Sequence, residues 1–231
     1  MEFKILNQPQ ASCCGASTGC CDLSYPVAII GAGPIGLAAA AHLKKRNIPF
    51  FILEAGDVAS NVRSWQHVTL FSPWKYNVDE VAKELLVHAG WTMPEEEKIP
   101  TGQELLAQYL APLATLFKDS VHTNERVIAI TREETDRMKS TKRTDKPFLV
   151  FAQHEHGLKT YKASAILDAT GTWGNPNPAT SHGVLLPNEK QLNDKIDYHI
   201  PNVTEHQALY AKEIKRNTRR TRKNRNYGGI R

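Results

Sequence analysis

The chain has 231 residues, of which 41% are hydrophobic and 23% charged, a balance that excludes a largely disordered protein. No apolar run approaches the ~20 residues that a membrane-spanning helix needs, so we expect no membrane partner. The net charge of +5 comes from residues 212–231, which hold nine Lys or Arg and one Glu, while the rest of the chain is net −3. A fold that binds a specific nucleic acid is therefore not expected.

The N-terminal segment, residues 1–25, is polar and rich in Cys, Gly and Ser, which predicts a flexible leader. It has no basic stretch followed by an apolar one, so we expect no secretory signal. Its thiols, Cys13, Cys14, Cys20 and Cys21, do not make a disulfide framework, which favours the cytoplasm. Two interpretations stay open for them: incidental thiols, or a site for a thiophilic metal or metalloid.

A strand, a glycine-rich turn, a helix and a second strand come next. Residues 27–30 are an apolar run of the length of a buried strand, and residues 37–46 have the composition of a helix with a basic last turn. Between them lies Gly31-Ala32-Gly33-Pro34-Ile35-Gly36, and residues 49–54 form a second apolar strand that ends in an acid. This order is typical of a βαβ unit with a parallel sheet.

The three glycines of the turn have separate physical roles. Gly31 allows a tight turn, Gly33 allows a pyrophosphate to approach the backbone, and Gly36 allows the helix to pack closely. The helix start offers free N–H groups and a partial positive charge, and Pro34 fits where no N–H is needed. Glu54, about twenty residues further on, can accept both hydroxyls of a ribose. The pattern therefore predicts a dinucleotide-binding site.

The remaining elements suit the same architecture. We predict, in chain order, an aromatic loop at 55–77, a helix at 79–88, a helix from the capping box at Thr101 to about Phe117, and strands at 125–131, 148–153 and 159–168. Residues 125–153 are interpreted as an antiparallel excursion before the last strand of the parallel sheet. The predicted fold class is α/β, a Rossmann-like domain with a parallel sheet and an antiparallel excursion. Residues 204–231 are predicted as a basic, disordered tail.

The segment after the last predicted strand adds a resemblance to a known family. The glycine turn with Glu54, the strand at Val127 and the run Asp168-Ala169-Thr170-Gly171-Thr172-Trp173-Gly174-Asn175-Pro176-Asn177-Pro178 resemble the N-terminal half of flavoproteins with two dinucleotide domains. The most similar groups are the flavin-containing monooxygenases and the thioredoxin reductase-like oxidoreductases. The resemblance covers about Tyr25 to Val203 and implies an FAD-binding domain at 26–203, with FAD as a noncovalent cofactor.

By position, the resemblance assigns ten residues to FAD. The glycine turn would line the pyrophosphate, Glu54 would bind the adenosine ribose, Val127 would contact the adenine, and the turn after the last strand would lie near the phosphates. The expected cofactor-binding residues are Gly31, Ala32, Gly33, Pro34, Ile35, Gly36, Glu54, Val127, Thr170 and Gly171. No catalytic residue and no metal site is assigned, and the pair His154 and His156 is interpreted as an exposed hairpin end because it lacks a carboxylate or Cys partner.

The sequence also departs from the family pattern. A second GxGxxG, which holds NADPH in the family, should begin shortly after residue 211, where the basic tail lies instead. The Phe-x-Gly-x-x-x-His motif of the monooxygenases and the dithiol of the disulfide reductases near the glycine turn are also missing. We therefore expect an incomplete FAD-binding oxidoreductase, with a parent activity like that of an NADPH-dependent flavin monooxygenase and an undefined substrate. The alternative is a non-catalytic fragment that binds FAD or a thiophilic metal.

Overall fold

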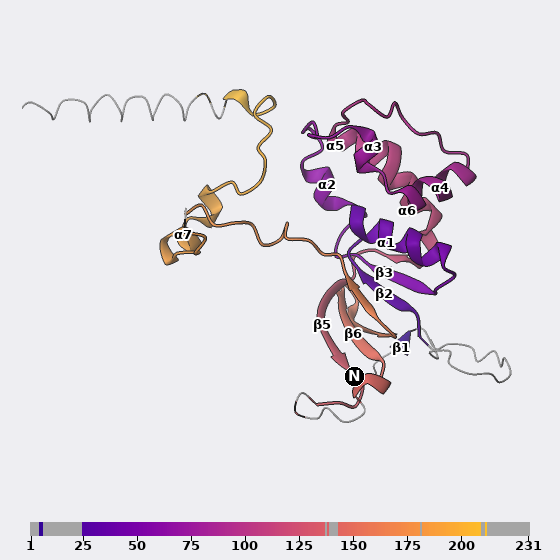
Figure 1. Ribbon diagram of the computed structural model, residues 1–231. Coiled ribbons are helices and arrows are strands. Elements are labelled where there is room, and N and C mark those ends of the chain that lie inside the picture. The colour runs from indigo at the N-terminus through magenta and orange to yellow at the C-terminus, as the bar shows by residue number, and fades with distance from the viewer. Residues whose placement is uncertain are drawn as a thin grey trace, which may run out of the picture. The chain divides into compact units, whose positions relative to one another are not determined.

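The computed structural model of the chain describes residues 5–6, 25–136, 138, 143–180, 182–208 and 211. The chain divides into two compact units, Met1–Asn175 and Pro176–Arg231, so the predicted domain at 26–203 extends into both. The first unit contains both sheets and most helices, as Figure 1 shows. The second contains α7 (Pro187–Gln191) and the short 3-10 helix η4 (Asn193–Lys195). No helix in the described part of the chain is long and apolar enough to cross a membrane.

A four-stranded parallel sheet in the order β4-β3-β2-β8 lies at the centre of the first unit. β2 (Val27–Ile30) pairs on one side with β3 (Phe50–Leu53) and on the other with β8 (Ile166–Asp168). β4 (Val121–His122) extends the sheet beyond β3. α1 (Pro34–Lys45) connects β2 to β3 and begins three residues earlier than predicted, because Pro34 occupies its first turn. The predicted βαβ unit is therefore confirmed.

A second sheet, in the order β1-β7-β6-β5, forms the antiparallel excursion. β5 (Arg126–Arg132), β6 (Phe148–His154) and β7 (Gly157–Ala163) are antiparallel neighbours. β1 (Ile5–Leu6), in the segment predicted as a leader, pairs with β7 in parallel. The excursion is confirmed, and its sheet includes two strands beyond the two predicted, β1 and β7.

The single strand predicted over residues 159–168 is wrong, since this segment belongs to two sheets. β7 ends at Ala163 and β8 begins at Ile166. At the break, the Ser164 N–H donates to the Pro26 carbonyl and the Ala165 carbonyl accepts from the Ala28 N–H. The chain therefore leaves the antiparallel sheet and enters the parallel one within two residues, which the local sequence of this segment does not reveal.

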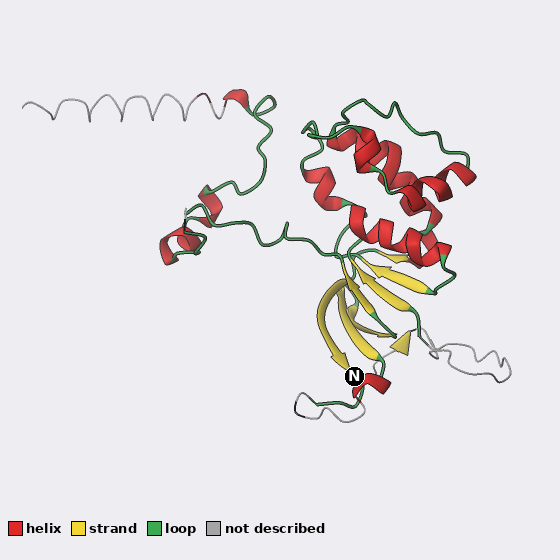
Figure 2. Ribbon diagram, viewed as in Figure 1, coloured by secondary structure: helices red, strands yellow, loops and turns green. Residues whose placement is uncertain are grey.

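The parallel sheet separates two hydrophobic layers. Side chains alternate across a strand, so Ile29 and Ile52 face the helices while Ala28 and Ile30 face the antiparallel sheet and its buried Tyr161. Figure 2 shows this order of helices, parallel sheet and antiparallel sheet. The remaining helical elements of this unit are α2 (Ser60–Ser64), α3 (Trp74–Asn77), α4 (Glu80–His88), α5 (Gly102–Leu105), η1 (Leu106–Leu110), α6 (Ala111–Leu116), η2 (Lys118–Ser120) and η3 (Arg143–Asp145).

The helix predicted from Thr101 to about Phe117 is present as α5, η1 and α6 in succession. Thr101 and Glu104 form the predicted capping box. The central η1 is a π-helical stretch, and it lies just before Pro112, which has no N–H to donate to the carbonyl of Gln108. The indole N–H of Trp91 donates to that carbonyl instead, at 2.6 Å. The sequence predicted the start of this helix but not its π turn.

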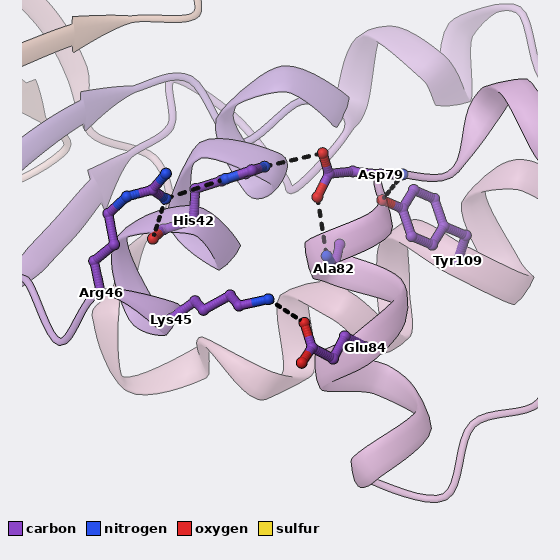
Figure 3. A network of polar contacts seen from close by, with 7 residues as sticks. All are labelled: His42, Lys45, Arg46, Asp79, Ala82, Glu84 and Tyr109. Carbon is purple, nitrogen blue, oxygen red and sulfur yellow. Dashed lines mark hydrogen bonds and ion pairs between the residues drawn. The ribbon is translucent and has the colours of Figure 1, made fainter.

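A polar network joins α1 to the other helices (Figure 3). The Nε2 of His42 lies 3.1 Å from Oδ2 of Asp79, whose Oδ1 accepts the Ala82 N–H at 2.9 Å and so caps α4. The Asp79 N–H donates to the hydroxyl of Tyr109 at 3.1 Å, and burial raises the pKa of Tyr109 to about 12. The network fixes the helical layer against α1, which carries the glycine turn.

Replacing Asp79 with alanine should lower the free energy of unfolding by about 1–2 kcal/mol, because α4 loses its N-cap and His42 loses its acceptor. Asp79→Asn is the matched variant, since its amide oxygen can still cap α4 and should preserve most of the stability. Urea denaturation of both variants measures the difference. Equal losses in the two variants would contradict a capping role.

Candidate functional site

The carboxyl ends of the central parallel strands open onto a cavity of about 420 Å³. Loops that follow parallel strands meet at one edge of the sheet, where open α/β sheets bind ligands. Here the loops after β2, β3 and β8 meet the first residues of β5. Eight of the ten predicted residues line the cavity: Gly31, Gly33, Pro34, Ile35, Glu54, Val127, Thr170 and Gly171. The other two, Ala32 and Gly36, are buried next to it.

Gly31 sits where two loops touch. Its φ of +102° is a conformation that other residues rarely adopt, and a Cβ built on it would lie 2.7 Å from the Ala169 carbonyl oxygen. The Gly31 N–H donates to the Leu53 carbonyl and the Ala169 N–H donates to the Ile30 carbonyl. The glycine therefore serves the tight turn, as predicted, and also the close approach of the loop after β8.

Gly36 and Gly33 differ in what surrounds them. A Cβ on Gly36 would lie 1.9 Å from the Gly31 carbonyl oxygen and 3.5 Å from Cγ2 of Ile29, so α1 packs tightest against the turn that precedes it. A Cβ on Gly33 would meet no atom of the described residues within 4 Å. Gly33 also lines the cavity, so a side chain added there would lie at the cavity wall.

The N-terminus of α1 forms one wall of the cavity. Gly33 is the N-cap residue and Pro34 is in the first turn, followed by Ile35, whose side chain is 72% exposed. The first N–H groups of a helix have no partner within the helix and carry a partial positive charge. No acidic side chain in the first turn neutralises this charge. This wall can therefore accept a phosphate.

Glu54 lies at the end of β3 and holds two loops together. Its Oε2 accepts the Ala32 N–H at 2.7 Å, and its Oε1 accepts the Gly56 N–H at 3.0 Å. Ala32 thus contributes through its N–H to Glu54 rather than by lining the cavity. A carboxylate has about four acceptor positions, so each oxygen of Glu54 retains one for a ligand hydroxyl.

The loop after β8 is shaped by Asp168, which the sequence analysis did not assign to the site. Its Oδ1 accepts the hydroxyl of Thr170 at 2.8 Å and the Thr170 N–H at 3.1 Å. These two bonds lower the pKa of Asp168, the side-chain bond having the larger effect. An Asp two residues before a Thr in a turn is the signal for this local bond. Asp168 therefore fixes the Thr170-Gly171 turn, in which Gly171 has a φ of +64°.

The start of β5 contributes a buried acid. The Glu125 N–H donates to the Glu54 carbonyl at 2.8 Å, which ties β5 to the end of β3. The Glu125 side chain is 2% exposed and pairs with Lys159, while its Oε2 has no hydrogen-bond partner in the described part of the chain. Burial, and then the charge of Glu125, raise the pKa of Tyr161. Burial also lowers the pKa of His122 nearby.

Two charged residues of the cavity wall were missed by sequence reasoning. Arg126 lines the cavity and forms no ion pair with any described residue, so its charge is available to an anionic ligand. Glu125 also lines it. Both directly precede the predicted contact Val127, but charged residues at the start of an exposed strand are common and gave no signal by themselves.

Comparison with known proteins identifies the family. Residues 28–204 match the pyridine nucleotide-disulphide oxidoreductase family. The chain belongs to this family. Its resemblance to flavoprotein oxidoreductases and its predicted α/β class are thereby confirmed.

Individual proteins also align with part of the chain. The probable indole-3-pyruvate monooxygenase YUCCA8 of Arabidopsis thaliana is 31% identical over 134 residues, which are 58% of this chain and 29% of that protein. YUCCA3 of the same plant is 33% identical over 120 residues, 52% of this chain and 26% of that one. The bacillithiol disulfide reductase Bdr of Bacillus cereus has a TM-score of 0.53 at 26% identity, with 68% of this chain and 42% of that one covered. The chain thus spans less than half the length of these relatives.

Two predictions concern segments that lie wholly or mostly outside the described residues, and they stay predictions. Cys13, Cys14, Cys20 and Cys21 lie outside the described residues, so the choice between incidental thiols and a thiophilic metal site is not tested. Most of the predicted basic tail, residues 212–231, also lies outside them.

Proposed function

We propose that this member of the pyridine nucleotide-disulphide oxidoreductase family binds FAD noncovalently, holding its ADP half in the cavity at the end of the parallel sheet. The observation that carries the proposal is the position of Gly33: it lines the cavity, it is the N-cap residue of α1, and the place of its missing side chain meets no described atom within 4 Å. A pyrophosphate fits such a cradle because it needs both close backbone approach and N–H donors.

Different residues of the cavity would bind the pyrophosphate, the ribose and the adenine of FAD. The turn at 31–36 would hold the pyrophosphate, and the charge of Arg126 would add to its attraction. The free acceptor positions of Glu54 would bind the ribose hydroxyls, and Val127 would contact the adenine. The Thr170-Gly171 turn would close the phosphate side. FAD, when bound, supplies the electron-transfer chemistry, and the residues of this chain hold and orient it.

For the parent activity we propose an NADPH-dependent flavin monooxygenase. Support comes from YUCCA8 and YUCCA3, two monooxygenases by name that are 31% and 33% identical to aligned parts of this chain. The second candidate is a non-catalytic FAD-binding protein, which is favoured by the single GxGxxG in these 231 residues. Under either candidate we expect no NADPH site in these 231 residues, the substrate is undefined, and the expected compartment is the cytoplasm.

Calorimetric titration with FAD, FMN and ADP tests the cofactor proposal. We expect FAD to bind, ADP to compete with it, and FMN to bind far more weakly, because FMN lacks the adenosine that Glu54 and Val127 would hold. Equal affinity for FMN and FAD, or FAD binding that ADP does not displace, would contradict the proposal.

An NADPH oxidation assay with saturating FAD tests whether this chain is catalytic by itself. We expect no turnover above the rate of free FAD, since this chain offers no second dinucleotide fingerprint. Turnover that depends on the protein would exclude the non-catalytic candidate and would contradict the missing NADPH site.

Replacing Glu54 with glutamine should raise the Kd for FAD by about tenfold to a hundredfold, since a hydrogen bond to a charged group is worth about 1.5–3 kcal/mol. The melting temperature should also fall, because the amide nitrogen would face the N–H of Ala32 or Gly56 instead of accepting from it. Glu95→Gln, an exposed residue far from the cavity lining, is the control. Unchanged FAD affinity in Glu54→Gln would exclude the proposed ribose contact.

A further inference from the structure

Three adjacent side chains meet at the tip of the β6–β7 hairpin. β6 ends at His154 and β7 begins at Gly157, directly opposite it in the antiparallel register. Gly157 has a φ of +123°, which allows the tight turn that Glu155 and His156 form. One potential ligand atom from each of His154, Glu155 and His156 lies within 4.8 Å of the other two. The turn therefore places two imidazoles and a carboxylate around one point.

The distances at this tip are near those that a tetrahedral metal site requires. The ring centroids of His154 and His156 are 5.1 Å apart. Two imidazoles that share one tetrahedral ion, with metal–nitrogen bonds of ~2.0–2.1 Å, have their centroids about 5 Å apart. The His156 Nε2 lies 3.0 Å from the Glu155 Oε1, close to the ~3.3 Å between two ligand atoms of such an ion. The three side chains therefore lie close enough for one ion to bridge them after small movements.

We propose that His154, Glu155 and His156 form a binding site for a divalent transition metal ion of the Zn²⁺ class. Two imidazoles and one carboxylate are ligands that Zn²⁺ accepts, with further positions left for water. The side chains of Glu155 and His156 are 73% and 79% exposed, so an ion can reach them from solvent. The sequence interpretation discounted the histidine pair because it lacked a carboxylate, and Glu155 supplies one.

Metal binding must displace two contacts of the metal-free hairpin. The His156 N–H donates to Nδ1 of His154 at 3.3 Å, and Glu155 pairs with His156. Coordination by His154 through Nδ1 uses its lone pair, and coordination through Nε2 leaves Nδ1 protonated, so either mode breaks the first bond. Ligating imidazoles must also be unprotonated, so binding should release protons and weaken in acid. The His156 amide resonance is therefore a local reporter.

The metal site is separate from the proposed FAD site. None of the three residues lines the cavity at the end of the parallel sheet. Zn²⁺ should therefore leave FAD affinity unchanged, and a failure of FAD binding would not affect the metal proposal.

Calorimetric and NMR titration of the full chain with Zn²⁺ tests this site, in a background where the four cysteines are replaced by serine so that thiolates do not compete. We expect one ion per chain and a shift of the His156 amide resonance. His154→Ala and His156→Ala should each weaken binding by about tenfold or more, and Glu155→Gln by less, because an amide oxygen remains a weaker ligand.

The matched control is the double variant His67→Ala/His88→Ala, which removes two exposed histidines elsewhere. It should bind Zn²⁺ as the background protein does. Equal loss of binding in this control, undiminished binding in the His154→Ala/His156→Ala double variant, or an unmoved His156 amide would each overturn the proposal.

Discussion

Replacing Gly33 with valine should abolish FAD binding while leaving the fold intact. Gly33 lines the cavity and a Cβ built on it meets no described atom within 4 Å, so we expect a valine side chain to occupy the place proposed for the pyrophosphate without a clash at its Cβ. The backbone of Gly33, with φ −80° and ψ −174°, is extended and accessible to valine. Calorimetry should show no saturable FAD binding, and the melting temperature should change by little.

Gly33→Ala is the graded companion of this variant. Its single methyl group should weaken FAD binding less than valine does, because it fills less of the cradle. A Gly33→Val protein that retains wild-type FAD affinity would contradict the assignment of the pyrophosphate to this turn. One that unfolds would contradict the open environment of the Cβ.

Replacing Gly36 with alanine should have the opposite consequence, a loss of stability. Its Cβ would lie 1.9 Å from the Gly31 carbonyl oxygen, far inside van der Waals contact, and both groups belong to the backbone. Either α1 or the glycine turn must move, at a cost of about 3 kcal/mol or more. Urea or thermal denaturation should show this loss, and FAD binding should weaken as the turn distorts.

Gly33→Ala also serves as the control for Gly36→Ala, since it adds the same methyl group three residues earlier in the chain. Its free energy of unfolding should lie within about 0.5 kcal/mol of the wild-type value. If Gly36→Ala proves as stable as Gly33→Ala, the close packing of α1 on the Gly31 turn is wrong.

The glycine turn was predictable because its residues meet requirements of the local backbone and of the adjoining helix and strands. Gly31 must adopt a positive φ, Pro34 suits the start of α1, and the acid at Glu54 ends the next strand. These requirements act within about twenty-five residues, so the βαβ unit could be predicted from spacing alone. Likewise, the capping box at Thr101 marked a helix start through a local bond.

The parts that the sequence did not predict depend on contacts between distant segments. β4 has two residues and exists only because it pairs with β3. The break between β7 and β8 depends on hydrogen bonds to Pro26 and Ala28. The local sequence of these segments does not indicate that they pair with segments more than fifty residues away.

Charged groups of the site were missed for a related reason. Glu125 becomes significant through its burial and its pairing with Lys159, 34 residues later in the chain. Arg126 becomes significant because its strand starts at the edge of the cavity. The pattern around Val127 predicted a strand but not which neighbours would face a ligand.

Amide hydrogen exchange with and without FAD tests whether FAD binds in the cavity at the end of the parallel sheet. We predict slower exchange in three segments far apart in the sequence, residues 31–36, 54–61 and 169–174, which contribute to one cavity wall. Residues 79–117, in the helical layer and outside the cavity lining, should be unaffected. Absence of protection in the three segments at saturating FAD, or protection confined to residues 79–117, would contradict the account.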